Sequence, residues 1–184
     1  MRRSQFIKSV FLFSSILFIK PSSILAGVNF VRIGKKAPDF LLNGFNKNKP
    51  NQNKWSLNDF SDKWLILYFY PKDFSSGCTI EAKAFQDNLS KFKKLNSTIV
   101  GISADNQEEH ESFCTSAKLG YTLLSDTTGE ISKSYDSWLD PYSKRNTFLI
   151  NPEGIVVYKW IGVRPLGHAQ EVLEELIKQQ KIYA

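Results

Sequence analysis

The residues best suited to chemistry form one short stretch, Pro71 to Cys78, with the sequence PKDFSSGC. It follows an apolar run at 64–70 and precedes TIEAKAF, whose apolar spacing is typical of a helix. Cys78 therefore falls in the first turn of a predicted helix, where unpaired N–H groups and the helix dipole favour an anion. Because a thiol attacks as its thiolate, this position favours a nucleophilic cysteine.

Two neighbours of Cys78 suit the same chemistry. Gly77 lets the backbone come close to whatever approaches the sulfur, and Ser75 offers a hydroxyl that can bond a substrate oxygen. A guanidinium nearby would complete the site, because arginine stays charged and offers several donors. The alternative is that Cys78 is only a small buried residue at a helix start, and the spacing alone does not decide between the two interpretations.

Hydrophobic periodicity predicts the elements that must position this stretch. Buried strands are expected at 64–70 and 98–103, and a turn at Asn151–Gly154 predicts a hairpin. The segment 43–57 is rich in Asn and Lys and is expected to be an exposed loop. The remaining expected segments are short strands within 28–42 and at 121–124, hairpin strands at 147–150 and 155–160, and helices at 78–94, 106–119, 128–135 and 169–179.

This order of elements defines the expected fold class. Strand and helix alternate twice, and a hairpin and a last helix follow, as in an α/β domain with parallel strands and one antiparallel edge. We expect a single domain over 27–184, a central mixed sheet flanked by helices, compatible with a thioredoxin-like fold.

The first 26 residues have the composition of a leader. Basic residues come first, an apolar run follows at 9–19, and Ala26 provides a small residue before a cut. As a helix, such a run is about 16 Å long against about 30 Å of bilayer hydrocarbon, so no stable membrane span is expected. We predict cleavage and export; an uncleaved anchor or an organelle transit peptide is the alternative.

The net charge of +6 belongs mainly to this leader. Without its four basic residues the chain keeps 20 basic and 18 acidic residues, a net charge of +2. No basic patch with interleaved aromatic residues is visible, so a nucleic-acid partner is not expected.

Several motifs together resemble the peroxiredoxins, thiol peroxidases of thioredoxin fold. YFYPKDFSSGCTIEA is similar to their active-site segment, Pro-x-x-x-Thr/Ser-x-x-Cys, and most resembles the peroxiredoxin Q, or bacterioferritin-comigratory-protein, subfamily. The likeness extends from about Gly34 to the last helix and includes GKKAPDF, LLSD, KRNTFLINPEG and GHAQEVLEEL.

The resemblance implies a role for each matching residue. Cys78 would be the peroxidatic cysteine, which attacks the peroxide and becomes a sulfenic acid. Ser75 would hold the peroxide, and Pro71 would shield the sulfur from water. Arg145 would stabilise the thiolate, and Glu81 would orient Arg145, although each of these two is open to a plain surface or helix-start role. Such a site needs no metal or organic cofactor.

The second cysteine departs from the commonest family pattern. Many relatives carry a resolving cysteine five residues after the first, where this chain has Lys83. Some peroxiredoxin Q members resolve from the helix that corresponds to 106–119, so the resemblance makes Cys114 the candidate resolving cysteine. Partial unwinding of the first helix would be needed for the two sulfurs to meet. A one-cysteine enzyme and a static structural bridge stay open as alternatives.

Neither histidine is expected to act in catalysis. His110 lies in a charged stretch and is predicted to be exposed, whereas His168 begins the last helix and is predicted to cap or pack. Two distant histidines and two cysteines at this spacing make a poor metal site.

The favoured function is reduction of hydrogen peroxide and organic hydroperoxides by a monomer or weak dimer, with electrons from a thioredoxin-like dithiol. Export would place it in a periplasm or a thylakoid lumen. An exported thiol–disulfide oxidoreductase is the alternative enzyme, but it relies on Cys-x-x-Cys, and Ser75 occupies the first cysteine's position. The third hypothesis is a non-catalytic binding module with a structural disulfide and no reactive thiol.

Overall fold

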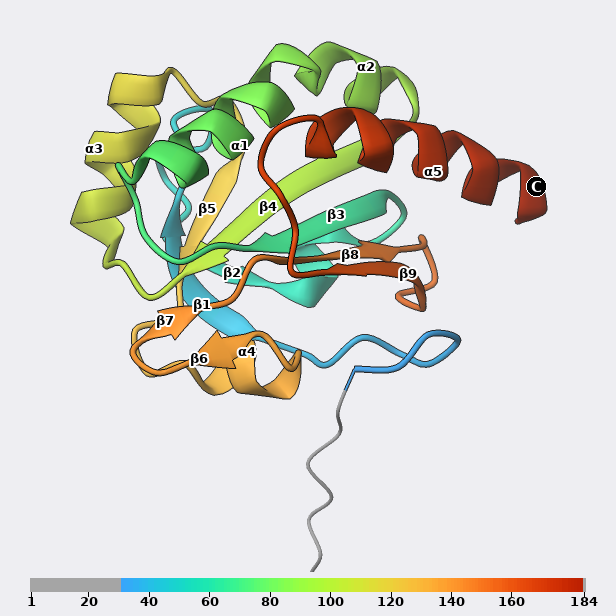
Figure 1. The fold of residues 1–184 in the computed structure, drawn as a ribbon, viewed down its shortest axis with the longest axis horizontal. Helices are drawn as coiled ribbons and strands as arrows, with labels where there is room; N and C mark the ends of the chain where they lie inside the picture. The colour runs from blue at the N-terminus through green and yellow to red at the C-terminus, as the bar shows by residue number, and fades with distance from the viewer. Residues whose placement is uncertain (1–30, 184) are drawn as a thin grey trace, which may run out of the picture.

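The computed structural model describes residues 31–183, so the predicted leader at 1–26 lies outside the described part (Figure 1). Seven strands form one mixed sheet in the order β2–β1–β5–β4–β3–β8–β9. Its strands are β1 (Leu41–Phe45), β2 (Lys54–Ser56), β3 (Trp64–Phe69), β4 (Ser97–Ser103), β5 (Thr122–Ser125), β8 (Asn146–Ile150) and β9 (Val156–Ile161). The helices are η1 (Leu57–Phe60), α1 (Ser76–Asp87), α2 (Leu89–Lys94), α3 (Gln107–Ala117), α4 (Glu130–Ser134) and α5 (His168–Ile182).

The strand β3 lies in the interior of the sheet, and all six of its residues are buried. It runs parallel to β4 and antiparallel to β8, so it is paired on both edges. The continuous apolar run is the composition of a strand covered on both faces, and the sequence prediction for 64–70 is confirmed.

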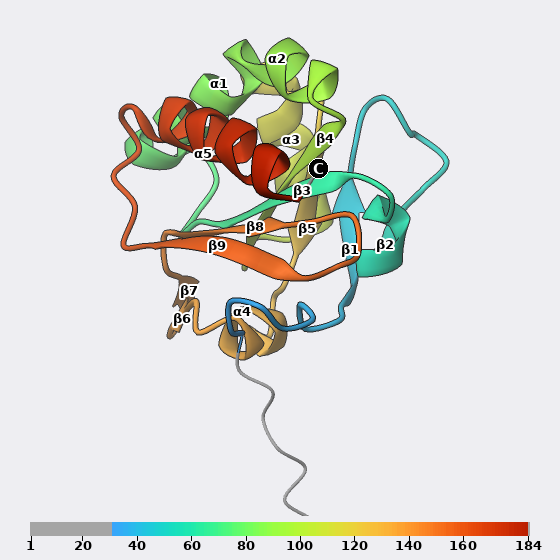
Figure 2. The ribbon, with the colours of Figure 1, turned by 90° about the vertical axis from the view of Figure 1, so that its right-hand side faces the viewer.

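The two faces of the sheet are covered by different layers. Helices α1, α2, α3 and α5 lie on one face, and α4 lies on the other (Figures 1 and 2). Side chains alternate along β3 accordingly: Ile66 and Tyr68 join the apolar cluster of the four helices, and Leu65 and Phe69 join the opposite cluster. This single domain has the thioredoxin-like fold that the sequence predicts.

The C-terminal hairpin also agrees with the sequence. Strands β8 and β9 are antiparallel neighbours, joined through a turn at Asn151–Gly154. Gly154 adopts a φ of 75°, a conformation that glycine accepts without strain.

The predicted exposed loop at 43–57 is partly wrong. Its ends are strands, because β1 pairs with β2 in antiparallel register, and only its middle, 47–53, is mostly exposed. Trp55 is fully buried and stacks on Phe60 with ring centroids 5.8 Å apart. One aromatic residue within a polar stretch outweighed the composition of the segment, since its burial fixes the strand against the sheet.

The predicted helix at 78–94 is two helices. Asn88 separates α1 from α2, and its side-chain amide donates to the Ala84 carbonyl at 2.9 Å. This local bond lets the chain leave the helix at Asn88. A small second hairpin, β6 (Trp138–Leu139) with β7 (Tyr142–Ser143), was not predicted at all.

Within the described part of the chain, no helix has both the length and the apolar character to span a membrane.

Candidate active site

Cys78 lies in the first turn of α1, as the sequence predicts. The chain leaves the end of β3, passes through a loop at 70–75 and enters the helix after its N-cap residue, Ser75. The residue is 1% exposed, so the sulfur lies under the surface near the positive end of the helix.

Two hydrogen-bond donors converge on this sulfur. The Ser75 hydroxyl donates to Cys78 Sγ at 2.7 Å, and Arg145 Nη2 donates to it at 3.3 Å. The two residues come from the helix start and from the segment before β8, and both point at the same atom. Donors of this kind stabilise a thiolate over a thiol, because the charged form accepts the stronger hydrogen bonds.

Glu81 forms an ion pair with the same arginine. Its carboxylate accepts from Arg145 Nη1 at 3.0 Å, and the carboxylate is almost wholly buried. Burial raises the pKa of Glu81 to about 7, although the charge and hydrogen bond of Arg145 lower it. Arg145 thus contacts Glu81 through Nη1 and Cys78 through Nη2.

The contribution of Gly77 to this geometry differs from the close backbone approach to a substrate that the sequence predicts. A Cβ at this position would lie 2.8 Å from Arg145 Nη2. The absence of a side chain at Gly77 therefore makes room for the guanidinium beside Cys78. Pro71 lies half-buried in the loop at 70–75 that precedes the helix.

Arg145 itself is fixed from the sheet. It immediately precedes β8, and its carbonyl accepts from the Val163 N–H at 2.8 Å. The structure thus brings together Cys78, Ser75, Arg145 and Glu81, four of the residues to which the resemblance gives a role.

Cys114 occupies a different environment. It lies on α3 and is fully buried, and it belongs to the same apolar cluster as Cys78. Burial, together with the charge of Asp73, raises the pKa of Cys114 to about 12. Both cysteines are free thiols in this structure.

The prediction that His110 is exposed is wrong. The residue is fully buried, with Nδ1 2.7 Å from Asp73 Oδ2. Asp73 lies 37 residues earlier, in the loop before α1, so the periodicity of α3 carried no sign of this partner. For His168 the predicted packing role is confirmed, since it is buried and its Nε2 lies 2.8 Å from Thr147 Oγ1.

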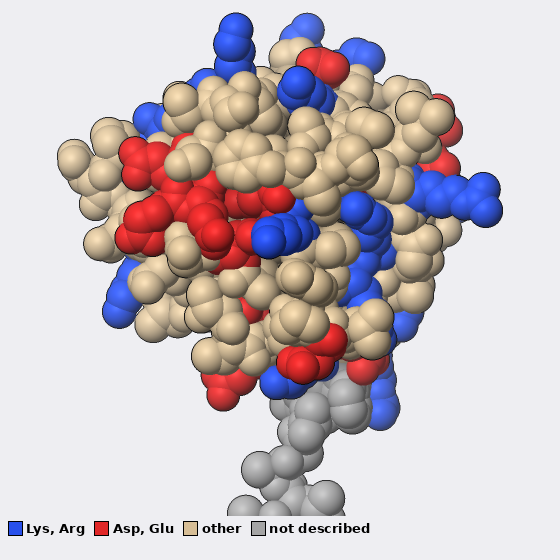
Figure 3. All heavy atoms as spheres, turned by 60° about the vertical axis from the view of Figure 1, so that its left-hand side comes forward, with Lys and Arg blue, Asp and Glu red and all other residues tan. Residues whose placement is uncertain are grey.

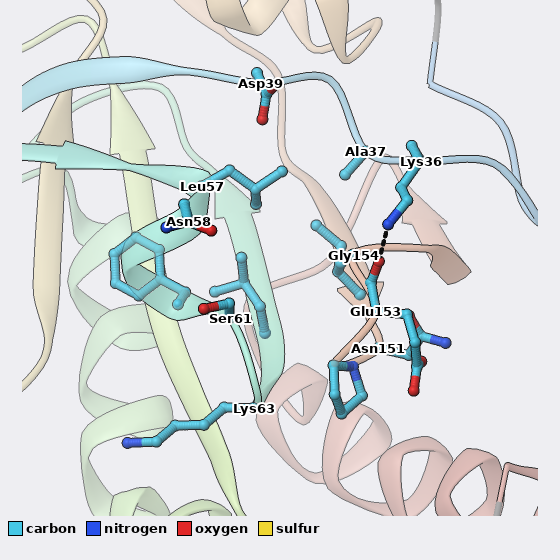
Figure 4. Close-up of a pocket in the computed structure, with 14 residues that line it drawn as sticks. Lys36, Ala37, Asp39, Leu57, Asn58, Ser61, Lys63, Asn151, Glu153 and Gly154 are labelled. Carbon is cyan, nitrogen blue, oxygen red and sulfur yellow. Dashed lines mark hydrogen bonds between the residues drawn. The ribbon is translucent and has the colours of Figure 1, made fainter.

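A cavity of about 350 Å³ lies elsewhere in the molecule (Figure 4). Lys36, Asn58, Lys63 and Asn151 are among its lining residues, and Lys36 donates to the Glu153 carbonyl. The lining includes neither cysteine nor Arg145, so this cavity is separate from the thiol cluster. Residues 31–183 also contain no group of three His, Cys, Asp or Glu side chains placed to hold a metal ion.

Acidic side chains gather on the surface over α3 (Figure 3). Its exposed carboxylates include Glu108, Glu109 and Glu111. The helix that carries Cys114 therefore faces solvent with negative charge, whereas the sulfur of Cys78 faces a guanidinium.

A thiol at a helix start, paired with an arginine on a thioredoxin-like fold, defines the class of thiol-based redox enzymes. A family model described as the AhpC/TSA family matches residues 33–159. Peroxiredoxin Bcp of Bacillus subtilis is 35% identical over 154 residues, which cover 79% of this chain and 95% of that protein. The chloroplastic peroxiredoxin Q of Arabidopsis thaliana is 36% identical over 179 residues, covering 94% of this chain and 81% of that protein.

Solved structures agree with these relatives. The bacterioferritin comigratory protein of Xanthomonas campestris, described for its alkyl peroxide reduction activity, is 30% identical with a TM-score of 0.70, covering 76% of this chain and 91% of that one. Two structures of Xanthomonas campestris peroxiredoxin Q, one for each of two cysteine-to-serine variants, align at the same identity and TM-score.

The chain belongs to the AhpC/TSA family, within the peroxiredoxins of the Q and Bcp kind. It is a thiol peroxidase, and the alternative of a thiol–disulfide oxidoreductase is not favoured.

Proposed function

We propose that Cys78 is the peroxidatic thiol and Cys114 the resolving thiol of this peroxidase. The observation that carries the first assignment is the pair of donors on one sulfur, Ser75 at 2.7 Å and Arg145 at 3.3 Å. No other cysteine among residues 31–183 has such donors, because Cys114 is the only other one and lies in an apolar cluster.

In the first step the thiolate of Cys78 attacks one peroxide oxygen. An S–O bond forms, the O–O bond breaks, and the departing oxygen takes a proton to leave as water or an alcohol. Negative charge moves from the sulfur to the two oxygens, so the Arg145 guanidinium and the Ser75 hydroxyl stabilise the transition state as well as the thiolate. The same two donors align the peroxide with the sulfur.

Two further residues, Glu81 and Pro71, support this step without a hydrogen bond to the sulfur. Glu81 keeps the Arg145 guanidinium turned toward the sulfur through the 3.0 Å ion pair. Pro71 keeps bulk water from the thiolate, a role supported by its half-buried place in the loop that leads to α1.

In the second step the thiol of Cys114 attacks the sulfenic sulfur of Cys78, so that an S–S bond forms, the S–O bond breaks, and the hydroxyl leaves as water with the thiol proton. The position five residues after Cys78 is Lys83, so a resolving thiol within α1 is absent. The two serine variants of the Xanthomonas campestris protein replace cysteines 36 positions apart, the same separation as between Cys78 and Cys114. Partial unwinding of the first turn of α1 would bring the sulfurs together.

The substrates, reductant and compartment follow from the relatives and the leader. We propose hydrogen peroxide and alkyl hydroperoxides as substrates and a thioredoxin-like dithiol as the reductant of the disulfide. A monomer or weak dimer, exported by the leader at 1–26, is the proposed form. The chloroplastic peroxiredoxin Q supports a plastid as the alternative location.

The test is a titration of the reduced protein with hydrogen peroxide, followed by mass spectrometry of each cysteine. We expect one equivalent to oxidise Cys78 rapidly and to yield a Cys78–Cys114 disulfide. In Cys114→Ser the first oxidation should stay as fast, and a sulfenic acid should persist at Cys78. A Cys78 that reacts no faster than free cysteine would contradict the first assignment, and an intramolecular disulfide in Cys114→Ser would contradict the second.

A further inference from the structure

One residue in the loop before α1 has a strained backbone. Phe74 adopts a φ of 60°, in the left-handed region, which is a steric outlier for a bulky side chain and costs free energy. The other non-glycine residues of 31–183 with a positive φ are of a type, or at a helix end, that accepts it: Asp62, Asn96, Asp136, and Lys118 at the C-cap of α3. Phe74 is the one among them for which neither its type nor its position explains the conformation.

The residue before Phe74 is firmly bonded to the rest of the protein. The Asp73 N–H donates to Asp105 Oδ2 at 2.8 Å. The Asp73 carboxylate accepts from the Tyr70 hydroxyl at 2.7 Å, and its other oxygen lies 2.7 Å from Nδ1 of His110 on α3. All four residues are buried, and displacing Asp73 would leave buried polar groups without partners. Asp73 is therefore a fixed point from which the chain enters α1.

The helical turn after Phe74 is held more loosely. Within the described chain, the Ser75 side chain makes no capping bond to the backbone of α1. Its hydroxyl lies instead 3.0 Å from the Lys72 carbonyl and 2.7 Å from Cys78 Sγ. The Thr79 N–H, which donates to the Ser75 carbonyl at 2.9 Å, closes this first turn. A helix start without a side-chain cap opens more readily than the helix interior.

The ring of Phe74 contacts α3 next to the second cysteine. It meets the ring of Phe113 edge to face, with the centroids 5.2 Å apart, and Phe113 precedes Cys114 on α3. Phe74 is 55% exposed even so, and opening this contact brings little further apolar surface into water. The strained residue thus lies between a fixed point and a loose turn, beside the residue that precedes Cys114.

Resting on the proposed function of Cys114 as the resolving thiol, we propose that Phe74 is the hinge on which Cys78 moves to meet it. Asp73 stays bonded to its buried partners, the backbone of Phe74 leaves the left-handed region, and the first turn of α1 unwinds. The segment from Ser75 to Cys78 spans about 5 Å as a helical turn and about 10 Å when extended. The sulfur therefore travels while the start of the segment stays beside α3.

The strain at Phe74 favours this movement. A residue held in an unfavourable backbone conformation raises the free energy of the closed turn, and that free energy is released when the turn unwinds. The contact with Phe113 acts in the opposite direction and keeps the turn closed while Cys78 is reduced. Phe74 is thus a positioning residue, which acts through the backbone that carries Cys78.

The test compares two substitutions that differ in strain. Phe74→Gly and Phe74→Ala both remove the ring, but glycine accepts a φ of 60° and alanine does not. After one equivalent of hydrogen peroxide, we expect the Cys78–Cys114 disulfide to form roughly three- to tenfold more slowly in Phe74→Gly, a range that allows for the freedom glycine gains on unwinding. Oxidation of Cys78 itself should be equally fast in both. Equal rates of disulfide formation, or a faster glycine variant, would overturn the proposal.

Asp62 provides the matched control for a general change in stability. It also has a positive φ, of 62°, and it precedes β3, at the opposite end of that strand from the loop at 70–75. Asp62→Gly should resist chemical denaturation better than Asp62→Ala, yet both should form the disulfide at the native rate. A difference between these two variants as large as that at Phe74 would mean that overall stability sets the rate, and the hinge would be wrong.

Excess peroxide gives a second measurement on the same variants. A sulfenic acid at Cys78 that waits longer for Cys114 is more often oxidised by a second peroxide to the sulfinic acid. Phe74→Gly should therefore accumulate more sulfinic acid per turnover than Phe74→Ala, as measured by mass spectrometry. A purely structural role for the ring would give equal yields in the two variants, because both lack it, and that result would count against the hinge.

Failure of this proposal and failure of the proposed function look different. If native protein forms no Cys78–Cys114 disulfide, Cys114 is not the resolving thiol and both fall. If the native disulfide forms and the two Phe74 variants form it at the same rate, only the hinge is wrong.

Discussion

Cys78 and Cys114 share an apolar layer and differ in almost everything that decides reactivity. Cys78 lies in the first turn of a helix with a hydroxyl and a guanidinium on its sulfur. Cys114 lies late in a helix, and burial raises its pKa to about 12. The comparison teaches that burial alone does not set the fate of a thiol; the donors aimed at the sulfur do.

Replacing the nucleophile should produce the largest effect, and it tests directly whether Cys78 and Cys114 differ in reactivity. In Cys78→Ser we expect peroxidase activity to fall by at least about 10³-fold, because no other thiol is activated. Mass spectrometry after one equivalent of hydrogen peroxide should find Cys114 unmodified in this variant and Cys78 oxidised in Cys114→Ser. Rapid oxidation of Cys114 in Cys78→Ser would mean that the two thiols do not differ as the structure indicates.

Removing the guanidinium should make Cys78 resemble Cys114 more closely. In Arg145→Met we expect the rate of Cys78 oxidation to fall on the order of 10²-fold, because a charged donor to the sulfur and to the transition state is lost. Arg164→Met is the matched control, since that arginine is exposed. Stopped-flow measurement of the rate of Cys78 oxidation in both variants tests this prediction. Equal losses of rate would mean that the overall charge of the protein, and not the contact of Arg145 with the sulfur, sets the rate.

Displacing the guanidinium without removing it should have a smaller effect. In Gly77→Ala the new methyl would lie 2.8 Å from Arg145 Nη2 and push it from the sulfur. We expect a roughly tenfold slower oxidation of Cys78 and no loss of stability, since alanine is the better helix former by about 1 kcal/mol. Ser76→Ala, at the exposed neighbouring position, should react at the native rate in the same stopped-flow assay.

Glu81, the carboxylate paired with Arg145, should make the stability of the protein depend on pH. The folded protein holds the proton of Glu81 to about pH 7, above the ordinary 4.5 of a free glutamate. The folded state therefore binds more protons than the unfolded chain between these values, and the stability from this group falls as pH rises through that window. Between acid and alkaline pH, the unfolding free energy of Glu81→Gln should therefore rise by about 3 kcal/mol relative to that of the native protein.

Chemical denaturation of both proteins across this pH range measures that effect. A difference in unfolding free energy that stays constant with pH would show that Glu81 is ionised at its ordinary pKa. The same variant should oxidise Cys78 several-fold more slowly, because the guanidinium loses its partner.

Sequence patterns predicted the fold and the Cys78 half of the comparison well. The run at 64–70 and the helix predicted from residue 78 are local signals, and they place Cys78 in the first turn of α1, although that helix begins two residues earlier, at Ser76. Arg145 and Glu81 came from a resemblance, and the structure brings Arg145 to the sulfur and Glu81 to Arg145. What failed depended on distant partners: Trp55 buried within a polar segment, and His110 paired with a carboxylate from another element.

The two halves of the Cys78 cluster are anchored to different parts of the molecule. The sulfur lies on the opening turn of α1, where Ser75 makes no capping bond through its side chain. Arg145 leads into β8, a strand with neighbours on both edges. The guanidinium is thus anchored to the sheet, whereas the nucleophile lies on the end of a helix. Each time the cysteine returns to its reduced form, its sulfur meets the same cation. The site can then re-form in the same geometry after each turnover because the sheet, more than the helix, fixes the position of Arg145.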